Sequence, residues 1–538
     1  HQTEICSVSK EEYCEQTEVK VQLDDYVKAS RTAEAREGVK KFKPKTELPK
    51  TDWRRTLKYD VPDMIERVWL HENKSDYNDF IKRYEKDLKF GKVLDSEQIE
   101  RMKLLLFIFR KVASENPKVA TPIDGLECRL QFKSPNPKPY SRGLPRLSPG
   151  DMAIQSEMTN AMRKNGVIEY ADSEWSTGVV MAKKKGTSDK RYAVDYRGLN
   201  AELIGNVIGV PRIDDLLDTW SKSKWWSTFD LAAAFWSIPM RESDKKFTAF
   251  HAYCDGGFQQ YQFNVMPFGL KPASSLFQAA FQRVMSNLPF CRVYIDDGVC
   301  ATDTDSFDDH LQHLAHCFVR LEANNMTLKM SKSLWGTKEL PIVGHVIKAG
   351  QGCTADPAKV ECLLDMEAPG TILLLKSFLG AAGYLSKYIS DYAELVLPLR
   401  EMDDGRPKYT DISSEWSARR LRALDSLKAA LTTAPVLAAP DFSKPWIILT
   451  DCSDYAMGAC LAQLDENGIE RPVAYASANL SEAQKNYGIT DKEGLAVVWA
   501  VRKWRHFLHG SSAVVATDHS CLKDLTSGKE FNSKRLMR

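Results

Sequence analysis

Two adjacent carboxylates, Asp296 and Asp297, lie between apolar residues in a segment typical of a β-hairpin. Gly298 follows them and can take the positive φ that a tight turn needs. Neighbouring acids repel each other, so they are stable only where water or a divalent cation offsets their charge. A solvated turn is the alternative. A third acid, Asp230, ends a further predicted strand and makes a shared metal site the stronger hypothesis.

The predicted metal site is suited to phosphoryl transfer. Magnesium takes oxygen ligands, and phosphoryl-transfer sites use two ions about 4 Å apart to hold the attacking and leaving oxygens in line. Asp230 and the Asp296-Asp297 pair supply this geometry if their strands are neighbours in one sheet. Nothing else nearby offers a nucleophile, so the substrate must bring its own hydroxyl.

A second charged group lies at the tip of another predicted hairpin, formed by residues 179–182 and 191–195. The tip carries one anion, Asp189, and five cations, which are Lys183, Lys184, Lys185, Lys190 and Arg191. These cations form either a solvated turn or a clamp on phosphates, because Arg offers a planar fork and Lys a point charge. Charge alone favours neither alternative.

Three of the acids after residue 445 are candidates for a second site. Asp451 and Asp518 end two predicted strands, and Glu493 lies on a predicted helix over residues 490–508. A helix acid preceded by a lysine, here Lys492, is commonly just solvated. The position of Glu493 between two strand-end acids nevertheless favours a second active site.

Other helices are predicted over residues 151–165, 373–388 and 415–432, and the first begins with Ser148-Pro149. The 538 residues predict three or four domains of roughly 100 to 200 residues each. Basic and acidic residues number 74 and 72, a net charge of +2, so any polyanion must be bound by local patches.

The twelve cysteines include no Cys-x-x-Cys pair, which argues against a zinc finger and for a reduced, intracellular setting. The best candidate for a membrane span, the apolar run of residues 104–109, is interrupted at Arg110 and is far shorter than the roughly 20 residues that a span needs. The chain begins at His1 and stops within a basic segment, so we expect a piece of a longer polypeptide.

Seven motifs carry a family resemblance: DYRGLN (195–200), FDLAAAF (229–235), MPFGLKPASSLFQ (266–278), YIDD (294–297), VGHVI (343–347), SFLGAAGYL (377–385) and the TD, KE and ATDH acids beyond residue 450. In this order and spacing they resemble the reverse transcriptase and ribonuclease H segment of a gypsy-like LTR retrotransposon Pol polyprotein. Single motifs of this length are weak evidence, but seven in family order are strong evidence.

The resemblance implies roles for the first group of residues. Asp230, Asp296 and Asp297 match the catalytic metal ligands of the polymerase, and Lys184 and Arg191 match the cations that grip the incoming triphosphate. This match favours the phosphate clamp over the solvated turn.

The nucleotide pocket is implied in the same way. Phe235 matches the aromatic residue that blocks a 2′-hydroxyl, although alone it would be interpreted as a core phenylalanine. Phe268 and Gly269 match the lining of the substrate pocket, and Gln278 a helix that backs the template. Two departures, Ala234 for glycine and residues 272–274 for Asn-Ala-Pro, lie near this pocket and remove no metal ligand.

Two further sites follow from the resemblance. Gly344 and His345 match the turn that grips the primer. Asp451, Glu493 and Asp518 match the catalytic, metal-binding carboxylates of ribonuclease H, and His519 matches a family position that alone would be interpreted as structural. The family places a fourth acid beyond the basic stretch 533–538, so we expect this domain to be incomplete and its hybrid cleavage weak or absent.

The implied fold is α+β and multidomain, a right-hand polymerase of fingers, palm and thumb followed by a C-terminally truncated ribonuclease H-like α/β domain. The expected boundaries are an N-terminal extension or linker of unknown role (1–115), fingers in part (116–220), palm with an inserted fingers segment (221–340), thumb and connection (341–432) and the ribonuclease H-like domain (433–538).

The implied activity is RNA-directed and DNA-directed DNA synthesis with two Mg²⁺ ions per active site, or Mn²⁺ in their place. The implied partners are an RNA template, a DNA primer or RNA–DNA hybrid and deoxynucleoside triphosphates, with no membrane, in an intracellular, cytoplasmic virus-like particle. A catalytically decayed or domesticated nucleic-acid-binding relic is one alternative, against which the intact acids and cations argue. A polymerase of ribonucleotides is another, against which Phe235 argues.

Overall fold

The computed structural model describes residues 6–8, 61, 65, 74–113, 122–123, 125–143, 146–183, 190–205 and 211–517. The chain divides into two compact units, which are described separately. The unit that the motifs predict to be the polymerase, called the polymerase unit below, comprises residues 22–212 and 223–338, and the C-terminal unit comprises residues 1–21, 213–222 and 339–538. Within the described ranges, no helix combines the length and the apolar character that crossing a membrane requires.

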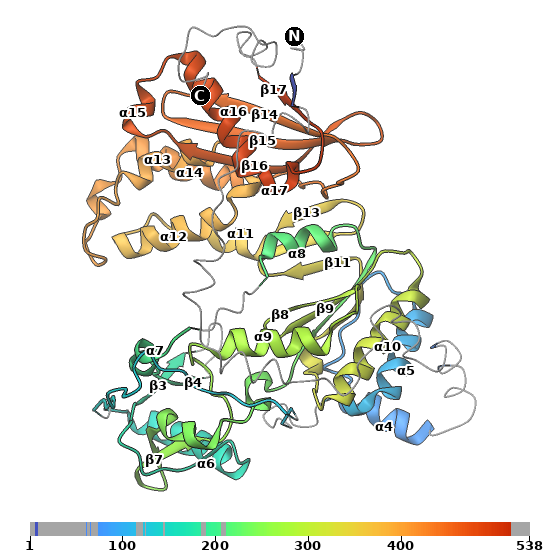
Figure 1. Cartoon of the computed structure of the whole chain (residues 1–538), viewed down its shortest axis with the longest axis vertical. Helices are drawn as coiled ribbons and strands as arrows, with labels where there is room; N and C mark the ends of the chain where they lie inside the picture. Colours follow the sequence, from blue (N-terminus) through green and yellow to red (C-terminus); the bar gives the residue numbers. More distant parts are fainter. Residues whose placement is uncertain are drawn as a thin grey trace. The chain divides into compact units, whose positions relative to one another are not determined.

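The polymerase unit mixes helices with three small sheets (Figure 1). In chain order its elements are α4 (Lys74–Tyr84), α5 (Ser96–Ile108), η2 (Arg110–Val112), α6 (Pro149–Lys164), β2 (Ile168–Tyr170), β3 (Val179–Lys183), β4 (Lys190–Val194), α7 (Arg197–Glu202), β5 (Trp225–Asp230), η3 (Ala234–Ser237), η4 (Glu242–Thr248), β6 (Phe250–Cys254), β7 (Gly257–Phe263), α9 (Ala273–Val284), β8 (Cys291–Tyr294), β9 (Asp297–Thr302), α10 (Phe307–Ala323), η5 (Met330–Lys332) and β10 (Leu334–Thr337).

A four-stranded antiparallel sheet in the order β10-β5-β9-β8 forms the centre of this unit. Its middle strands β5 and β9 are almost wholly buried, because α10 packs against both of them and α9 against β8. The other sheets are β2-β7-β6 and the β3–β4 hairpin, in which Val179 pairs with Val194. The hairpin predicted over residues 179–195 is therefore confirmed.

The helices begin where local capping chemistry predicts. Ser148 caps α6 by accepting a hydrogen bond from the Asp151 N–H, and Pro149 occupies the first turn, where no intrahelical donor is needed. Ser306 caps α10 in the same way through the Asp309 N–H. The predicted helix over residues 151–165 is confirmed.

A buried polar network ties α10 to the central strands. The ring of His310, which is fully buried, bonds to the Ser227 hydroxyl of β5 at 2.8 Å and to the Thr302 hydroxyl of β9 at 2.9 Å. The Thr302 hydroxyl is also 2.8 Å from Nδ1 of His313, and the Gly336 N–H donates to Ser227 Oγ at 2.9 Å. Three strands of the sheet are thus held to one helix through satisfied polar groups.

The C-terminal unit carries the remaining elements. They are β1 (Cys6–Val8), α8 (Ile213–Trp220), β11 (Glu339–Ile342), β12 (His345–Lys348), β13 (Gly352–Ala355), α11 (Pro357–Leu364), α12 (Ile372–Tyr384), η6 (Ser386–Tyr388), α13 (Tyr392–Arg400), η7 (Ser413–Glu415), α14 (Ala418–Thr432), β14 (Trp446–Cys452), β15 (Ala456–Leu464), β16 (Glu470–Asn479), α15 (Glu482–Lys485), α16 (Ile489–Lys503), α17 (Arg505–Leu508) and β17 (Ala513–Ala516).

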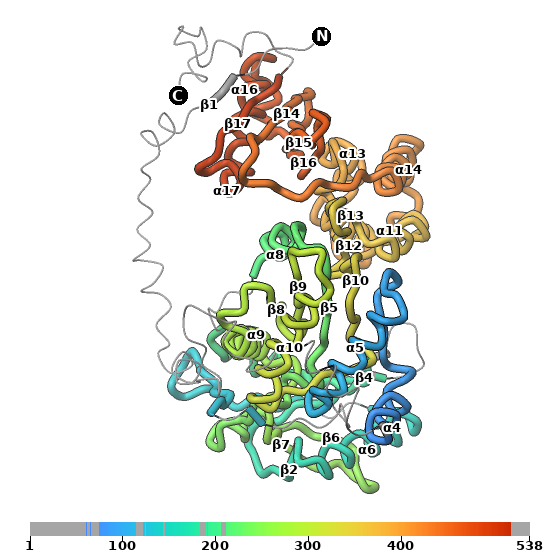
Figure 2. Tube along the Cα trace, turned by 90° about the vertical axis from the view of Figure 1, so that its right-hand side faces the viewer, coloured from blue at the N-terminus to red at the C-terminus, as the bar shows by residue number. Residues whose placement is uncertain are grey.

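Five strands of this unit form one sheet in the order β1-β17-β14-β15-β16. β14 runs parallel to β17 and antiparallel to β15, and α16 lies along β14 and β15 in both views (Figures 1 and 2). The predicted strands over 446–451 and 457–464 are confirmed. The helix predicted over 490–508 is interrupted at Trp504, the C-cap of α16, whose backbone is not helical. Strand β16 was not predicted.

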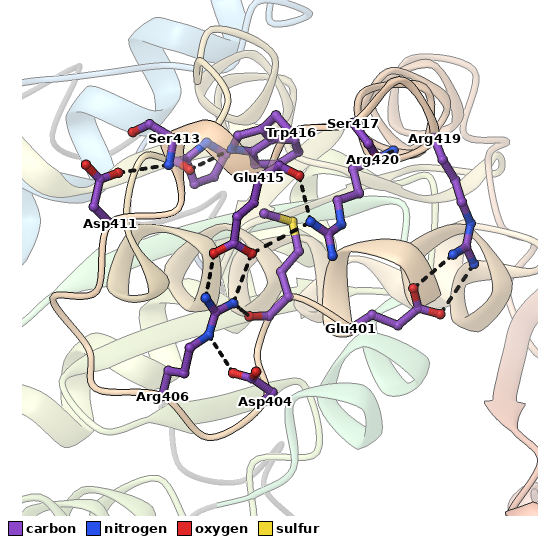
Figure 3. A network of polar contacts seen from close by, with 12 residues as sticks. Glu401, Asp404, Arg406, Asp411, Ser413, Glu415, Trp416, Ser417, Arg419 and Arg420 are labelled. Atoms are coloured by element: carbon purple, nitrogen blue, oxygen red, sulfur yellow. Dashed lines mark hydrogen bonds and ion pairs between the residues drawn. The ribbon is translucent and has the colours of Figure 1, made fainter.

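Ion pairs fix the loop between α13 and α14 (Figure 3). Arg406 donates to the Glu415 carboxylate at 2.5 Å and to the Met402 carbonyl oxygen at 2.5 Å. Arg420 donates to the Glu415 backbone oxygen at 2.6 Å, so Glu415 is held from both sides. The helix predicted over 415–432 begins three residues later than expected, at Ala418, because these residues form the turn that precedes it.

The His310 network predicts a pH dependence of stability. Burial, with a smaller contribution from the neighbouring His313, lowers the pKa of His310 to about 3. Between pH 6.5 and 3 the His310 side chain therefore binds a proton in the unfolded chain but not in the folded one. The free energy of unfolding falls by about 1.4 kcal/mol per pH unit as the pH drops through this range. We expect His310→Gln to be less stable than the parent at pH 7.5 and the difference to narrow by pH 5.

Denaturant unfolding at pH 7.5, 6 and 5 checks this expectation. His509→Gln, at an exposed position, is the control and should leave the pH dependence of the parent unchanged. A constant difference between His310→Gln and the parent at all three pH values would contradict the prediction.

Candidate active site

Strand register brings the three predicted polymerase acids together. Asp230, the last residue of β5, pairs with Asp297, the first residue of β9. Tyr294 of β8 also pairs with Asp297, so only Ile295 and Asp296 form the turn between the two strands. The Leu231 N–H donates to the Asp296 backbone oxygen at 3.3 Å. All three carboxylates therefore lie at one edge of the central sheet.

The hairpin tip is strained at an unexpected residue. Ile295 has φ +57°, whereas Gly298 does not take a positive φ, so the prediction that Gly298 supplies the turn conformation is wrong. A β-branched residue in this region costs about 1–3 kcal/mol and persists only where its surroundings impose it. Gly298 is needed for space, because a Cβ there would lie 2.1 Å from Cε2 of the buried Phe229 opposite it.

Gln278 of α9 holds the strained tip. Its side chain is fully buried, its Oε1 accepts from the Ile295 N–H at 2.5 Å, and its Nε2 donates to the Val293 oxygen at 3.1 Å. Both ends of the amide are thus engaged with the hairpin. The Gln278 amide thus supports the acidic turn, and its predicted substrate-binding place on a helix that backs the template stays a prediction.

The acids have a cation that the motifs did not reveal. Lys332 of η5 places its Nζ 2.7 Å from Asp230 Oδ2. Burial lowers the pKa of Lys332, but the hydrogen bond to Asp230 and the charges of Asp230, Asp296 and Asp297 outweigh it and raise this pKa overall. Desolvation and the charges of Asp296 and Asp230 raise the pKa of Asp297 to about 6. One ammonium therefore offsets only part of the repulsion among three acids.

The donor set fits a hard divalent cation, because it consists of three carboxylates that repel one another. Among the described residues, no three His, Cys, Asp or Glu side chains are already arranged as a finished metal site. The Lys332–Asp230 pair gives a physical reason, because the ammonium occupies an oxygen that an ion would need. An ion held by Asp230, Asp296 and Asp297 would therefore compete with the Lys332 ammonium for Asp230.

Three of the residues predicted to form the nucleotide pocket, Phe235, Phe268 and Gly269, lie close together. The rings of Phe235 in η3 and Phe268 meet edge to face with centroids 5.0 Å apart. Gly269 follows Phe268 with φ +90°, a conformation that favours glycine. Phe235 is half-buried against the core, so its core role and its predicted role at the pocket are compatible. Lys184 lies outside the described residues, as does the side chain of Arg191.

The predicted primer grip is a tight turn. Val343 and Gly344 join β11 to β12, both with positive φ, which is the two-residue turn that matches the twist of a hairpin. The His345 side chain is 2 % exposed and its Nδ1 is 2.8 Å from the Tyr388 hydroxyl. The imidazole is therefore held inside the unit by Tyr388, and the primer-grip role of Gly344 and His345 stays a prediction.

The C-terminal unit places two of the three ribonuclease H-type acids. Asp451 lies near the end of β14 opposite Gly458 of β15, and Glu493 lies on α16 with 5 % exposure. Burial and the charge of Glu493, with a smaller effect of Asp451, raise the pKa of Cys452 to about 11, so both acids lie near this thiol. The solvated alternative for Glu493 is wrong. Asp518 and His519 lie outside the described residues.

Sequence reasoning missed several neighbours of these acids. Lys492 is 6 % exposed and donates from Nζ to Asp454 Oδ1 at 2.7 Å. Asp391 and Glu394 line an open cavity of about 310 Å³ together with Asp451. No motif pointed to these two acids, because they come from a different helix, α13 and its N-cap.

Comparisons with known proteins agree with this geometry. Residues 182–347 match the family described as reverse transcriptase (RNA-dependent DNA polymerase), and residues 416–515 match the RNase H-like domain found in reverse transcriptase. These matches define a reverse transcriptase with an attached RNase H-like domain. The chain is similar to retrovirus-related Pol polyproteins of transposons, which confirms the resemblance drawn from the motifs.

Individual relatives support the same assignment. The chain is 32% identical over 386 residues to the Pol polyprotein from transposon opus of Drosophila melanogaster, covering 69% of this chain and 38% of that protein. It is 30% identical over 438 residues to the transposon Tf2-3 polyprotein of Schizosaccharomyces pombe, covering 80% of this chain and 32% of that protein. The chain thus spans well under half the length of these relatives.

Solved structures share the fold. A foamy viral protease–reverse transcriptase in complex with double-stranded DNA superposes with a TM-score of 0.72 at 19% identity, covering 86% of this chain and 79% of that one. The same viral protein with an RNA/DNA hybrid gives a TM-score of 0.69 at 19% identity, covering 88% of this chain and 63% of that one. The predicted multidomain α+β fold is confirmed, and the two domain families are ones that use divalent metal ions.

The Lys332–Asp230 pair predicts a change in metal affinity. Lys332→Met removes the ammonium that competes for Asp230, so Mn²⁺ should bind the chain about three to ten times more tightly, the value of a partly exposed ion pair. Paramagnetic resonance of Mn²⁺ titrated with the protein measures this affinity without nucleotide. Lys332→Arg keeps the charge and should stay close to the parent. Equal or weaker binding by Lys332→Met would contradict the prediction.

Proposed function

We propose that this chain catalyses DNA synthesis on RNA and DNA templates. The 3′-hydroxyl of a DNA primer attacks the α-phosphate of a deoxynucleoside triphosphate, a phosphodiester bond forms, and pyrophosphate leaves. One observation carries the proposal: Asp230 faces Asp297 across paired strands, with Asp296 in the strained turn beside them. This gathers three carboxylates where attacking and leaving oxygens can be held in line.

Asp230, Asp296 and Asp297 would hold two Mg²⁺ ions, with Mn²⁺ as a substitute. When bound, these ions lower the pKa of the primer hydroxyl and neutralise charge on the triphosphate. The chain's own contribution is position: β5 and β9 fix the acids, Gln278 fixes the turn, and Lys332 keeps Asp230 in place until an ion replaces the ammonium.

The substrate pocket supports deoxynucleotides over ribonucleotides. Phe235, backed by Phe268, presents an aromatic edge where a 2′-hydroxyl would need space. Lys184 and Arg191 stay proposed as the triphosphate grip, and Gly344 as the primer turn. The neighbouring viral structures hold double-stranded DNA and an RNA/DNA hybrid, which supports the same partners for this chain. The family resemblance supports action in an intracellular, cytoplasmic virus-like particle.

Primer extension tests this proposal. With Mg²⁺, an RNA template and a DNA primer, the parent chain should extend with deoxynucleotides, and Asp297→Asn should lose at least about 100-fold in rate because a metal ligand is lost. Asp305→Asn, at an exposed aspartate between the end of β9 and α10, is the matched control and should extend like the parent.

Each result separates the alternatives. No extension by the parent would favour a nucleic-acid-binding relic, and efficient use of ribonucleotides would favour an RNA polymerase. Extension by Asp297→Asn at the parent rate would reject the three-carboxylate site.

A second candidate function is cleavage of the RNA strand in an RNA–DNA hybrid. The observation that favours it is the burial of Glu493 close to Cys452, near the strand that carries Asp451. Asp518 stays proposed as the third acid. We expect any metal-dependent hybrid cleavage by this chain to be lost in Glu493→Gln, as measured with a labelled RNA strand, while primer extension continues. Cleavage that survives this substitution would reject the assignment.

A further inference from the structure

Asn200 connects α7 to the nucleotide pocket through both ends of its amide. Its Nδ2 donates to the Gly269 oxygen at 2.8 Å, and its Oδ1 accepts from the Lys271 N–H at 2.8 Å. Both partners are backbone groups of one turn, which lies about 70 residues further along the chain. A single side chain therefore fixes the path of the backbone on either side of Leu270.

The clamped turn determines where Phe268 lies. Phe268 immediately precedes Gly269, and its ring is 52% exposed. Its ring centroid lies 5.0 Å from that of Phe235 and 5.9 Å from that of Trp236, both with tilted or edge-to-face geometry. A half-exposed ring shifts with its backbone unless that backbone is held in place. The Asn200 amide supplies this constraint.

Phe268 in turn restricts Phe235. On its buried side, Phe235 contacts Phe277 with centroids 5.6 Å apart, and Phe277 is fully buried. On its other side lies Phe268. Trp236 supports the exposed ring by packing, since its indole N–H has no hydrogen-bond partner within the described part of the chain. Phe235 is thus held between one immobile ring and one ring whose place depends on Asn200.

We propose that Asn200 is a positioning residue for sugar selection. Through Gly269 and Phe268 it holds the edge of Phe235 at the height that excludes the 2′-hydroxyl of a ribonucleoside triphosphate. Loss of the clamp lets Phe268 and then Phe235 retreat, so that ribonucleotides enter while the metal-binding acids stay in place. This inference rests on the proposed polymerase function, because the selection acts on the incoming nucleotide.

The test compares deoxy- and ribonucleotide use by the full chain. Single-nucleotide extension of a DNA primer with dTTP and with UTP gives kcat and KM for each. For Asn200→Ala we expect kcat with dTTP within about threefold of the parent and a dTTP/UTP selectivity lower by roughly tenfold or more, mainly through a lower KM for UTP. Asn200→Asp keeps the acceptor for the Lys271 N–H and loses the donor to the Gly269 oxygen. Its dTTP/UTP selectivity should therefore lie between those of the parent and Asn200→Ala.

Double substitution shows whether the effect passes through Phe235. Phe235→Val should lower selectivity more than Asn200→Ala, and combining the two should add little, because residues in one contact chain are not additive. Asn486→Ala is the matched control: Asn486 also donates its amide to a backbone oxygen, that of Glu482 at 3.1 Å, in the C-terminal unit. It should leave selectivity unchanged.

The outcomes are distinguishable. Equal losses with dTTP and UTP in Asn200→Ala, or full additivity with Phe235→Val, would overturn the inference while the polymerase function stands. Absence of dTTP extension by the parent would overturn the proposed function and this inference with it. Unfolding midpoints of each variant within a few degrees of the parent show that the comparison is made on folded protein.

Discussion

Mutual repulsion of carboxylates is the constraint on which the rest of the polymerase unit depends. Burial, followed by the charges of the neighbouring acids, raises the pKa values of Asp296 and Asp297. The fold must therefore supply enough favourable packing to keep them together without an ion. β5 and β9 do so by being buried on both faces, and α10 reinforces them through the His310 network. Lys332 offsets part of the charge.

The hairpin tip stores strain for the same purpose. A looser loop would relieve Ile295, but it would also let Asp296 and Asp297 move apart into water. Gln278 prevents this with two hydrogen bonds from the core side, and the missing Cβ of Gly298 lets the Phe229 ring fill the space beneath. The local conformational cost is thus offset by burial and hydrogen bonding that the hairpin alone could not provide.

The sequence predicted the acids and their strands because both signals are local: an apolar run ending in a carboxylate. It did not predict the partners that come from elsewhere in the chain. Lys332 lies 102 residues from Asp230 in sequence, and nothing in its own segment indicates a carboxylate partner. Gly298 was interpreted from turn chemistry, whereas its reason is the ring of Phe229 across the strand pair. The burial of His345 likewise depends on Tyr388. Residue type and spacing therefore predicted where the site residues lie, but not the contacts with distant residues that explain why each residue is needed there.

Contacts between residues that are distant in sequence also connect motifs that are spread widely along the chain. DYRGLN ends in the Asn200 amide, MPFG contains the turn that this amide clamps, and FDLAAAF ends in the ring that the turn supports. YIDD is held by the last residue of the MPFGLKPASSLFQ motif. These four motifs thus supply the members of contact chains that end at the aromatic pair Phe235–Phe268 and at the acidic turn. The motifs depend on one another because the fold must hold the carboxylates of Asp230, Asp296 and Asp297 close together and the ring of Phe235 in a fixed position.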